Sequence, residues 1–141
     1  MSLGDLDAVF ALELRAYPFP WSRAIFNDCL QSGFPGWVLT DGNKLYGYSM
    51  MSFGAGESHL LNLCIDPDIQ GEGFGAAFLD WIIEETKRRQ AQVLFLEVRP
   101  SNYGAIGLYE SRGFNQIGLR PEYYQAGKLR EDAIVMALQL L

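Results

Sequence analysis

A chain of 141 residues that is 49% hydrophobic has the size and apolar content of one globular domain, which excludes disorder as its main state and predicts a single domain over residues 1–141. Its 17 acidic and 11 basic residues give a net charge of −6, the wrong sign for a protein that neutralises nucleic-acid phosphates. Two cysteines and one histidine exclude a disulfide scaffold and predict no metal site. With no signal sequence and no run of about 20 apolar residues, we expect a cytoplasmic protein without a membrane partner.

The first elements are two helices. Apolar residues at helical spacing predict a helix over residues 6–17, which Pro18 and Pro20 prevent from continuing. Ser22 is a suitable N-cap for a second helix that runs to Leu30.

Three strands follow. Residues 37–40 and 44–53 predict a hairpin around the turn Asp41-Gly42-Asn43, and residues 59–65 predict a third strand that ends at Asp66-Pro67-Asp68. We interpret His59, at the start of that strand, as a structural residue.

The second half changes period. A long helix over residues 73–89 and an apolar strand over 93–98 make a βαβ unit whose two strands should be parallel. A shorter helix and two further strands are predicted over residues 102–111, 114–119 and 132–138. Antiparallel hairpins combined with one parallel crossover indicate an α+β fold with a mixed central sheet and about four helices.

A glycine-rich segment precedes the long helix. Residues 70–75 read Gln-Gly-Glu-Gly-Phe-Gly, which matches neither the Rossmann nor the Walker A spacing. Amide groups at a helix N-terminus can bind a phosphate, but glycines also serve a tight turn that packs a helix on a sheet. The glycines alone leave both interpretations open.

Several motifs together resemble one family. Beside the Gln-x-x-Gly-x-Gly order, they are Phe-Pro-Trp-Ser at 19–22, Leu-Glu-Val-Arg at 96–99, Leu-Tyr-Glu-Ser at 108–111, Tyr-Tyr at 123–124 and Arg-Glu-Asp-Ala-Ile at 130–134. This set, spread over residues 5–138, resembles the GCN5-related N-acetyltransferase (GNAT) family, and within it the RimI-type ribosomal-protein-alanine N-acetyltransferases.

The resemblance implies a function and a site. It implies transfer of acetyl from acetyl-CoA, without a metal, to the N-terminal α-amine of a ribosomal protein, with an alanine as the expected acceptor. It assigns Glu97 as general base and Tyr109 as general acid. The residues that it assigns to acetyl-CoA are Leu63, Cys64, Ile65, Gly71, Glu72, Gly73, Phe74, Gly75, Ala76 and Asn102.

The residues themselves are compatible with these roles without requiring them. Glu97 interrupts an apolar strand, where burial makes a carboxylate a stronger base, but it could instead pair with Arg99 or another cation. Tyr109 lies two helical turns after Asn102, so both could face an extended ligand arm, although a tyrosine there could also be packing. Tyr123 and Tyr124 are expected in the loop between the last two strands, where they could shape a peptide groove or be ordinary loop aromatics.

The acceptor class also follows from proton affinity. An α-amine is about one-tenth neutral at pH 7, whereas a lysine amine is neutral about four times in ten thousand, so one carboxylate serves the first more easily. A GNAT enzyme that acts on lysine side chains or small amines, and a non-catalytic acyl-CoA-binding module, remain alternatives. The oligomeric state is not indicated.

The sequence departs from the family in two places. Few residues precede the first helix, so the first strand typical of the family is expected to be short or missing. Gly71 and Ala76 stand where similar loops often carry Arg or Lys, which leaves the pyrophosphate to backbone amides.

Overall fold

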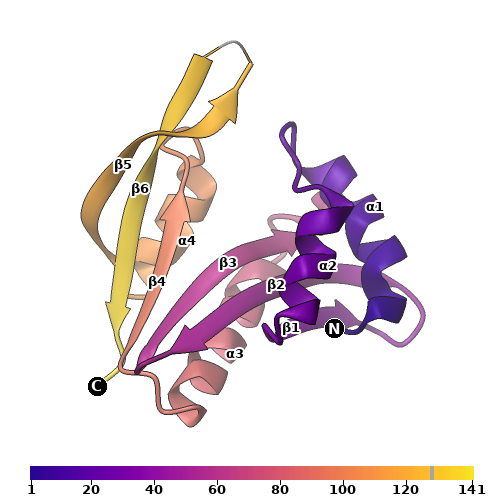
Figure 1. Cartoon of the computed structure of the whole chain (residues 1–141), viewed down its shortest axis with the longest axis horizontal. Coiled ribbons are helices and arrows are strands. Elements are labelled where there is room, and N and C mark those ends of the chain that lie inside the picture. The colour runs from indigo at the N-terminus through magenta and orange to yellow at the C-terminus, as the bar shows by residue number, and fades with distance from the viewer. Residues whose placement is uncertain (128) are drawn as a thin grey trace. The chain divides into compact units, whose positions relative to one another are not determined.

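The computed structural model describes residues 1–127 and 129–141, and within them it contains four α-helices and six strands (Figure 1). The helices are α1 (Leu6–Ala16), α2 (Arg23–Gln31), α3 (Phe74–Arg88) and α4 (Tyr103–Ser111). The strands are β1 (Gly36–Thr40), β2 (Leu45–Gly54), β3 (Glu57–Ile65), β4 (Val93–Val98), β5 (Asn115–Ala126) and β6 (Leu129–Gln139). They form one mixed sheet in the order β1-β2-β3-β4-β6-β5, which confirms the predicted α+β class. No helix in this described part is long and apolar enough to cross a membrane.

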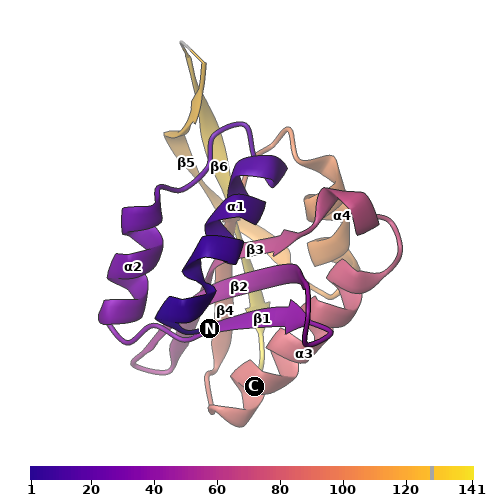
Figure 2. The ribbon, with the colours of Figure 1, turned by 90° about the vertical axis from the view of Figure 1, so that its right-hand side faces the viewer.

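The chain divides into two compact units, and the first comprises residues 1–52 and 61–79. Its α1 and α2 cover one face of β1 and β2 (Figure 2). They bury an apolar cluster made of Leu6, Val9, Leu12, Phe26, Tyr48, Met50 and Cys64. Burial of this cluster, at about 25 cal/mol per Å² of apolar surface, is what holds the two helices on the strands. The Ser22 hydroxyl accepts the N–H of Ile25 at 3.2 Å, so the predicted cap of α2 is confirmed.

The second unit comprises residues 53–60 and 80–141. Residues 57–60 of β3 pair in parallel with residues 93–96 of β4, as the βαβ pattern predicts. β4 pairs antiparallel with β6, and β6 with β5. Alternate side chains of β4 are buried, with Leu94, Leu96 and Val98 on one face and Glu97 on the other.

The last hairpin is longer than predicted. β5 and β6 extend to Ala126 and Leu129, so Tyr123 and Tyr124 lie within β5, and the prediction that they occupy a loop is wrong. The chain forms a bulge between Arg120 and Tyr124, with Glu122 at a φ of 51°. The ladder then resumes with Tyr124 opposite Glu131.

The start of the chain agrees with the prediction that the first strand is short or missing. The described residues before α1 form a 3-10 turn at Leu3–Asp5 and contain no strand.

Candidate active site

Glu97 is a nearly buried carboxylate with two partners from neighbouring strands. Its side chain is 8% exposed. The Nε2 atom of His59, on β3, contacts Oε2, and Nη2 of Arg120, on β5, lies 3.4 Å from Oε1. Pairing with Arg99 or another cation was one of the two alternatives for Glu97, and the structure shows such a pair with Arg120.

Tyr109 lies near the C-terminal end of α4 and is also buried. Its ring packs against Phe114, with 5.6 Å between the ring centroids. Burial raises the pKa of the phenol to about 12, so the hydroxyl keeps its proton at all physiological pH values. A buried, protonated phenol is suited to the role of general acid.

Tyr124 interacts electrostatically with both Glu97 and Tyr109. Burial is the main cause that raises its pKa, and the negative charge of Glu97 and the proximity of Tyr109 raise it further. The guanidinium of Arg99 lies over the Tyr124 ring, 4.4 Å from its centroid, and the ring of Tyr123 stands edge-on to it. The fold thus brings Glu97, Tyr109 and Tyr124 together in the second unit.

The sequence predicts Asn102 as the first residue of the helix, but in the structure it is the N-cap of α4. Its side-chain oxygen accepts the N–H of Ala105 at 3.2 Å. Just before it, the N–H and the hydroxyl of Ser101 both donate to Glu131 at 3.0 Å, and Arg99 adds a contact of 3.3 Å to the same carboxylate. These bonds fix the loop between β4 and α4, and with it the start of the helix that carries Tyr109.

The glycine turn in the first unit has the form of an anion cradle. Gly71 and Gly73 have φ values of 83° and 89°, and no heavy atom lies within 4 Å of the place where either would carry a Cβ. α3 starts at Phe74, so Gly75 and Ala76 lie in its first turn, which contains no acidic residue. Glu72 is exposed. Open space beside amides at a helix N-terminus fits a phosphate group.

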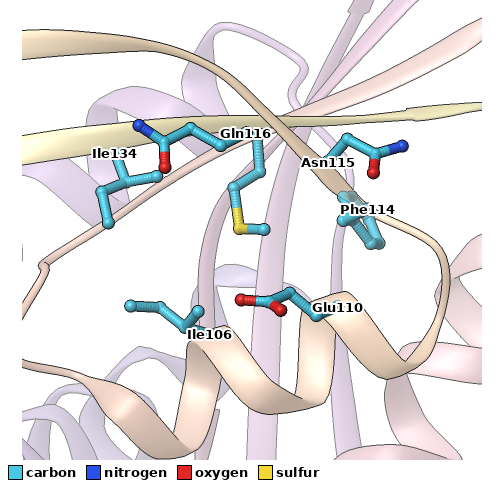
Figure 3. Close-up of a pocket in the computed structure, with 7 residues that line it drawn as sticks. Ile106, Glu110, Phe114, Asn115, Gln116 and Ile134 are labelled. Carbon is cyan, nitrogen blue, oxygen red and sulfur yellow. The ribbon is translucent and has the colours of Figure 1, made fainter.

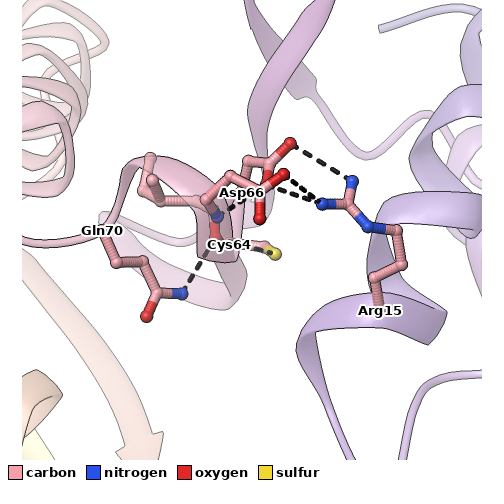
Figure 4. A network of polar contacts seen from close by, with 6 residues as sticks. Arg15, Cys64, Asp66 and Gln70 are labelled. Carbon is pink, nitrogen blue, oxygen red and sulfur yellow. Dashed lines mark hydrogen bonds and ion pairs between the residues drawn. The ribbon is translucent and has the colours of Figure 1, made fainter.

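The approach to this turn is anchored by a polar network (Figure 4). Arg15 of α1 binds both oxygens of Asp66, at 2.9 and 3.2 Å, and also contacts Asp68 at 3.0 Å. The N–H of Asp68 and this guanidinium hold the pKa of Asp66 below its usual range. Gln70 donates from Nε2 to the carbonyl of Ile65 at 3.0 Å. The end of β3 therefore enters the glycine turn along a fixed path.

The predicted cofactor contacts on β3 already have partners inside the chain. The hydroxyl of Tyr17 donates to the carbonyl of Leu63 at 2.7 Å, in addition to the bond between Gln70 and Ile65. Cys64 is buried, and burial raises the pKa of its thiol to about 11. The Cys64 thiol also donates to the carbonyl of Ile65, at 3.9 Å.

A separate cavity of about 240 Å³ lies between α4 and the β5–β6 hairpin (Figure 3). Ile106 and Glu110 line it from α4, and Gln116 and Ile134 line it from the strands. Its lining includes neither Glu97 nor Tyr109, so it is not the site of the predicted chemistry.

Sequence reasoning missed two members of the site. His59 was interpreted as structural, and Arg120 was not singled out, yet both contact Glu97. The signal for His59 is its place on the strand that pairs in parallel with β4. It lies opposite Phe95, which is two residues before Glu97 and on the same face of the sheet.

Comparison with known proteins identifies the family. The sequence model of the Acetyltransferase (GNAT) family matches residues 6–114. The [ribosomal protein bS18]-alanine N-acetyltransferase of Escherichia coli K12 is 40% identical over 136 residues, which is 96% of this chain and 92% of the relative. Its namesake in Salmonella typhimurium is 38% identical over 140 residues, 99% of this chain and 95% of that protein.

Solved structures of acetyltransferases share the fold of this chain. The crystal structure of the E. coli ribosomal-protein-S18-alanine N-acetyltransferase superposes with a TM-score of 0.93 at 39% identity, covering 99% of this chain and 90% of that one. Ard1 of Thermoplasma volcanium, at 23% identity, shares the fold with a TM-score of 0.87 over 100% of this chain and 95% of its own. The chain belongs to the GNAT family of acetyltransferases.

Proposed function

We propose that this enzyme transfers the acetyl group of acetyl-CoA to the N-terminal α-amine of a ribosomal protein, with alanine as the acceptor residue. The observation that carries the proposal is the 40% identity, over 96% of the chain, to an enzyme named for that reaction on bS18. The buried Glu97 and Tyr109 supply the acid–base groups that such a transfer needs.

The second unit performs the proton transfers in this proposal. The acceptor arrives mainly as an ammonium ion, and Glu97 removes its proton to leave a nucleophilic amine. Tyr109 holds at its Oη the proton that the departing thiolate requires, because burial keeps the phenol neutral. The second N–H proton, which the nitrogen loses as the amide forms, replaces it on the phenol. Tyr124, whose ring is covered by the Arg99 guanidinium, lies near the Glu97 carboxylate.

The first unit holds the donor in this proposal. Acetyl-CoA supplies an activated thioester together with an anionic pyrophosphate. The amides of residues 71–76 would bind the pyrophosphate, since the glycine turn is open and the first turn of α3 contains no acidic residue. The backbone of Leu63, Cys64 and Ile65 would bind the pantetheine arm. The turn itself contains no Arg or Lys, so the backbone amides carry this interaction.

Mass spectrometry on three peptides tests the proposed acceptor. The first has the N-terminal sequence of bS18 with a free α-amine, the second is the same peptide with a formylated α-amine, and the third begins with a residue other than alanine. Incubation with acetyl-CoA should acetylate the first peptide at its N-terminal residue, leave the second unmodified and modify the third more slowly. Acetylation of internal lysines in the formylated peptide would contradict the α-amine assignment.

A further inference from the structure

His59 is the neighbour of Glu97 that can exchange a proton. Its Nε2 contacts Oε2 of Glu97, and its side chain is 28% exposed whereas that of Glu97 is 8% exposed. The two residues come from adjacent parallel strands, β3 and β4, which fixes their separation through the backbone ladder. The imidazole thus lies between a buried carboxylate and the solvent.

We propose that His59 is a positioning residue that holds the Glu97 carboxylate and then carries its proton to solvent. The inference rests on the proposed function, in which Glu97 is the general base. It adds a step that the transfer itself leaves open, namely how a buried carboxylic acid returns to its charged form before the next turnover.

The proton balance requires such a step. When the ammonium ion gives up its proton, an N–H bond breaks and an O–H bond forms on Glu97. That O–H bond then breaks as neutral His59 forms an N–H bond at Nε2. The imidazolium releases its Nδ1 proton to water and is left neutral with its proton on Nε2, where it donates to the Glu97 carboxylate. Exchange with water then moves the proton from Nε2 back to Nδ1, so that Nε2 can accept again in the next turnover. The cycle oxidises and reduces nothing, and one proton per acetylated ammonium leaves by this path.

The other charged and titratable groups around the pair cannot serve this purpose. Arg120 of β5 faces Oε1 at 3.4 Å, but a guanidinium has no acceptor atom and does not lose its charge in proteins. Tyr124 of β5 lies near the charge of Glu97, but burial raises the pKa of its phenol, so the phenol stays protonated. An imidazole is the side chain that both accepts and releases protons near neutral pH. Arg120 holds one carboxylate oxygen, and His59 serves the other.

Two variants and chemical rescue test the proposal. We expect His59→Ala and His59→Gln to lower kcat on the bS18 peptide by about tenfold to a hundredfold, within or just below the usual contribution of acid–base catalysis. Added imidazole should restore the rate of His59→Ala in proportion to the concentration of its neutral form. Added imidazole should not change the rate of the wild-type enzyme. It should not raise the rate of Arg120→Gln either, which is the matched control at the other carboxylate oxygen.

The outcomes separate this inference from the proposed function. Unchanged kcat in His59→Gln, or a loss in His59→Ala that imidazole does not restore in protein with a wild-type melting transition, would overturn the role of His59. If His59→Ala fails to fold, His59→Gln decides, and wild-type kcat in it overturns the inference. The double variant His59→Ala/Glu97→Gln should be no slower than Glu97→Gln, since His59 acts through Glu97. A wild-type enzyme that does not acetylate the peptide would instead refute the proposed function. A fully active Glu97→Gln would refute the role of Glu97 as general base and, with it, the role of His59.

Discussion

The two units each bury one glutamate, and the two sites differ in their partners. Glu13 of α1 is 2% exposed, and three neutral groups donate to it: the Tyr48 hydroxyl, the Asn62 amide at 3.0 Å and the backbone N–H of Trp21 at 2.9 Å. Glu97 of β4 is 8% exposed and faces a guanidinium and an imidazole. Burial of a carboxylate is costly without partners, so both sites satisfy the same requirement in different ways.

The two carboxylates differ in the kind of partner that they have. The donors to Glu13 come from β2, β3 and the segment that leads into α2, so this carboxylate ties the first unit together. None of these donors exchanges protons near neutral pH. Glu97 has one partner of fixed charge and one, an imidazole, of the kind that exchanges protons near neutral pH, which suits the role of general base that we propose for it.

The sharpest test of this contrast is Glu97→Gln. It keeps the size of the side chain and removes its basicity, so we expect kcat on the bS18 peptide to fall by about 10² to 10⁴-fold. The matched variant Glu13→Gln, checked for folding by circular dichroism, should retain most of the activity. Both rates are measured with saturating acetyl-CoA. Comparable losses in the two variants would remove the distinction between the two glutamates.

The reverse effect is expected for stability. Glu13→Ala leaves three donors without an acceptor in the core of the first unit, which should lower the free energy of unfolding by about 3 kcal/mol or more. Urea unfolding measures this change, and Leu14→Ala, at the exposed next position of α1, is the control. A Glu13→Ala protein as stable as this control would show that the carboxylate is not structural.

The sequence indicates one of these glutamates and not the other. Glu97 was predicted because it interrupts an apolar strand and matches a family motif. Glu13 was missed because an acidic residue in an amphipathic helix is usually exposed, and its partners lie up to 49 residues away. Its burial is a tertiary effect that helical periodicity does not encode.

The same limit separates the other predictions that succeeded from those that failed. The Ser22 cap and the span of β4 depend on neighbouring residues, so local patterns predicted them. The contact of His59 with Glu97 spans 38 residues and depends on the register of two parallel strands. Tyr124 was predicted in the loop between the last two strands, whereas pairing across the hairpin extends β5 past the bulge.

The smallest expected effects concern the two buried tyrosines, which repeat the contrast. Tyr48 donates to Glu13, so Tyr48→Phe should lower stability by about 1 kcal/mol and leave kcat unchanged. Tyr109→Phe should lower kcat by about tenfold and leave the urea midpoint nearly unchanged, because its ring contact with Phe114 remains.

The phenol of Tyr109 has a pKa of about 12, so its proton is retained below that pH and lost above it. The wild-type rate should therefore not fall between pH 8 and 10 through ionisation of Tyr109. A loss of rate in Tyr48→Phe equal to that in Tyr109→Phe would mean that burial alone, and not the partner, determines which polar groups act in the reaction.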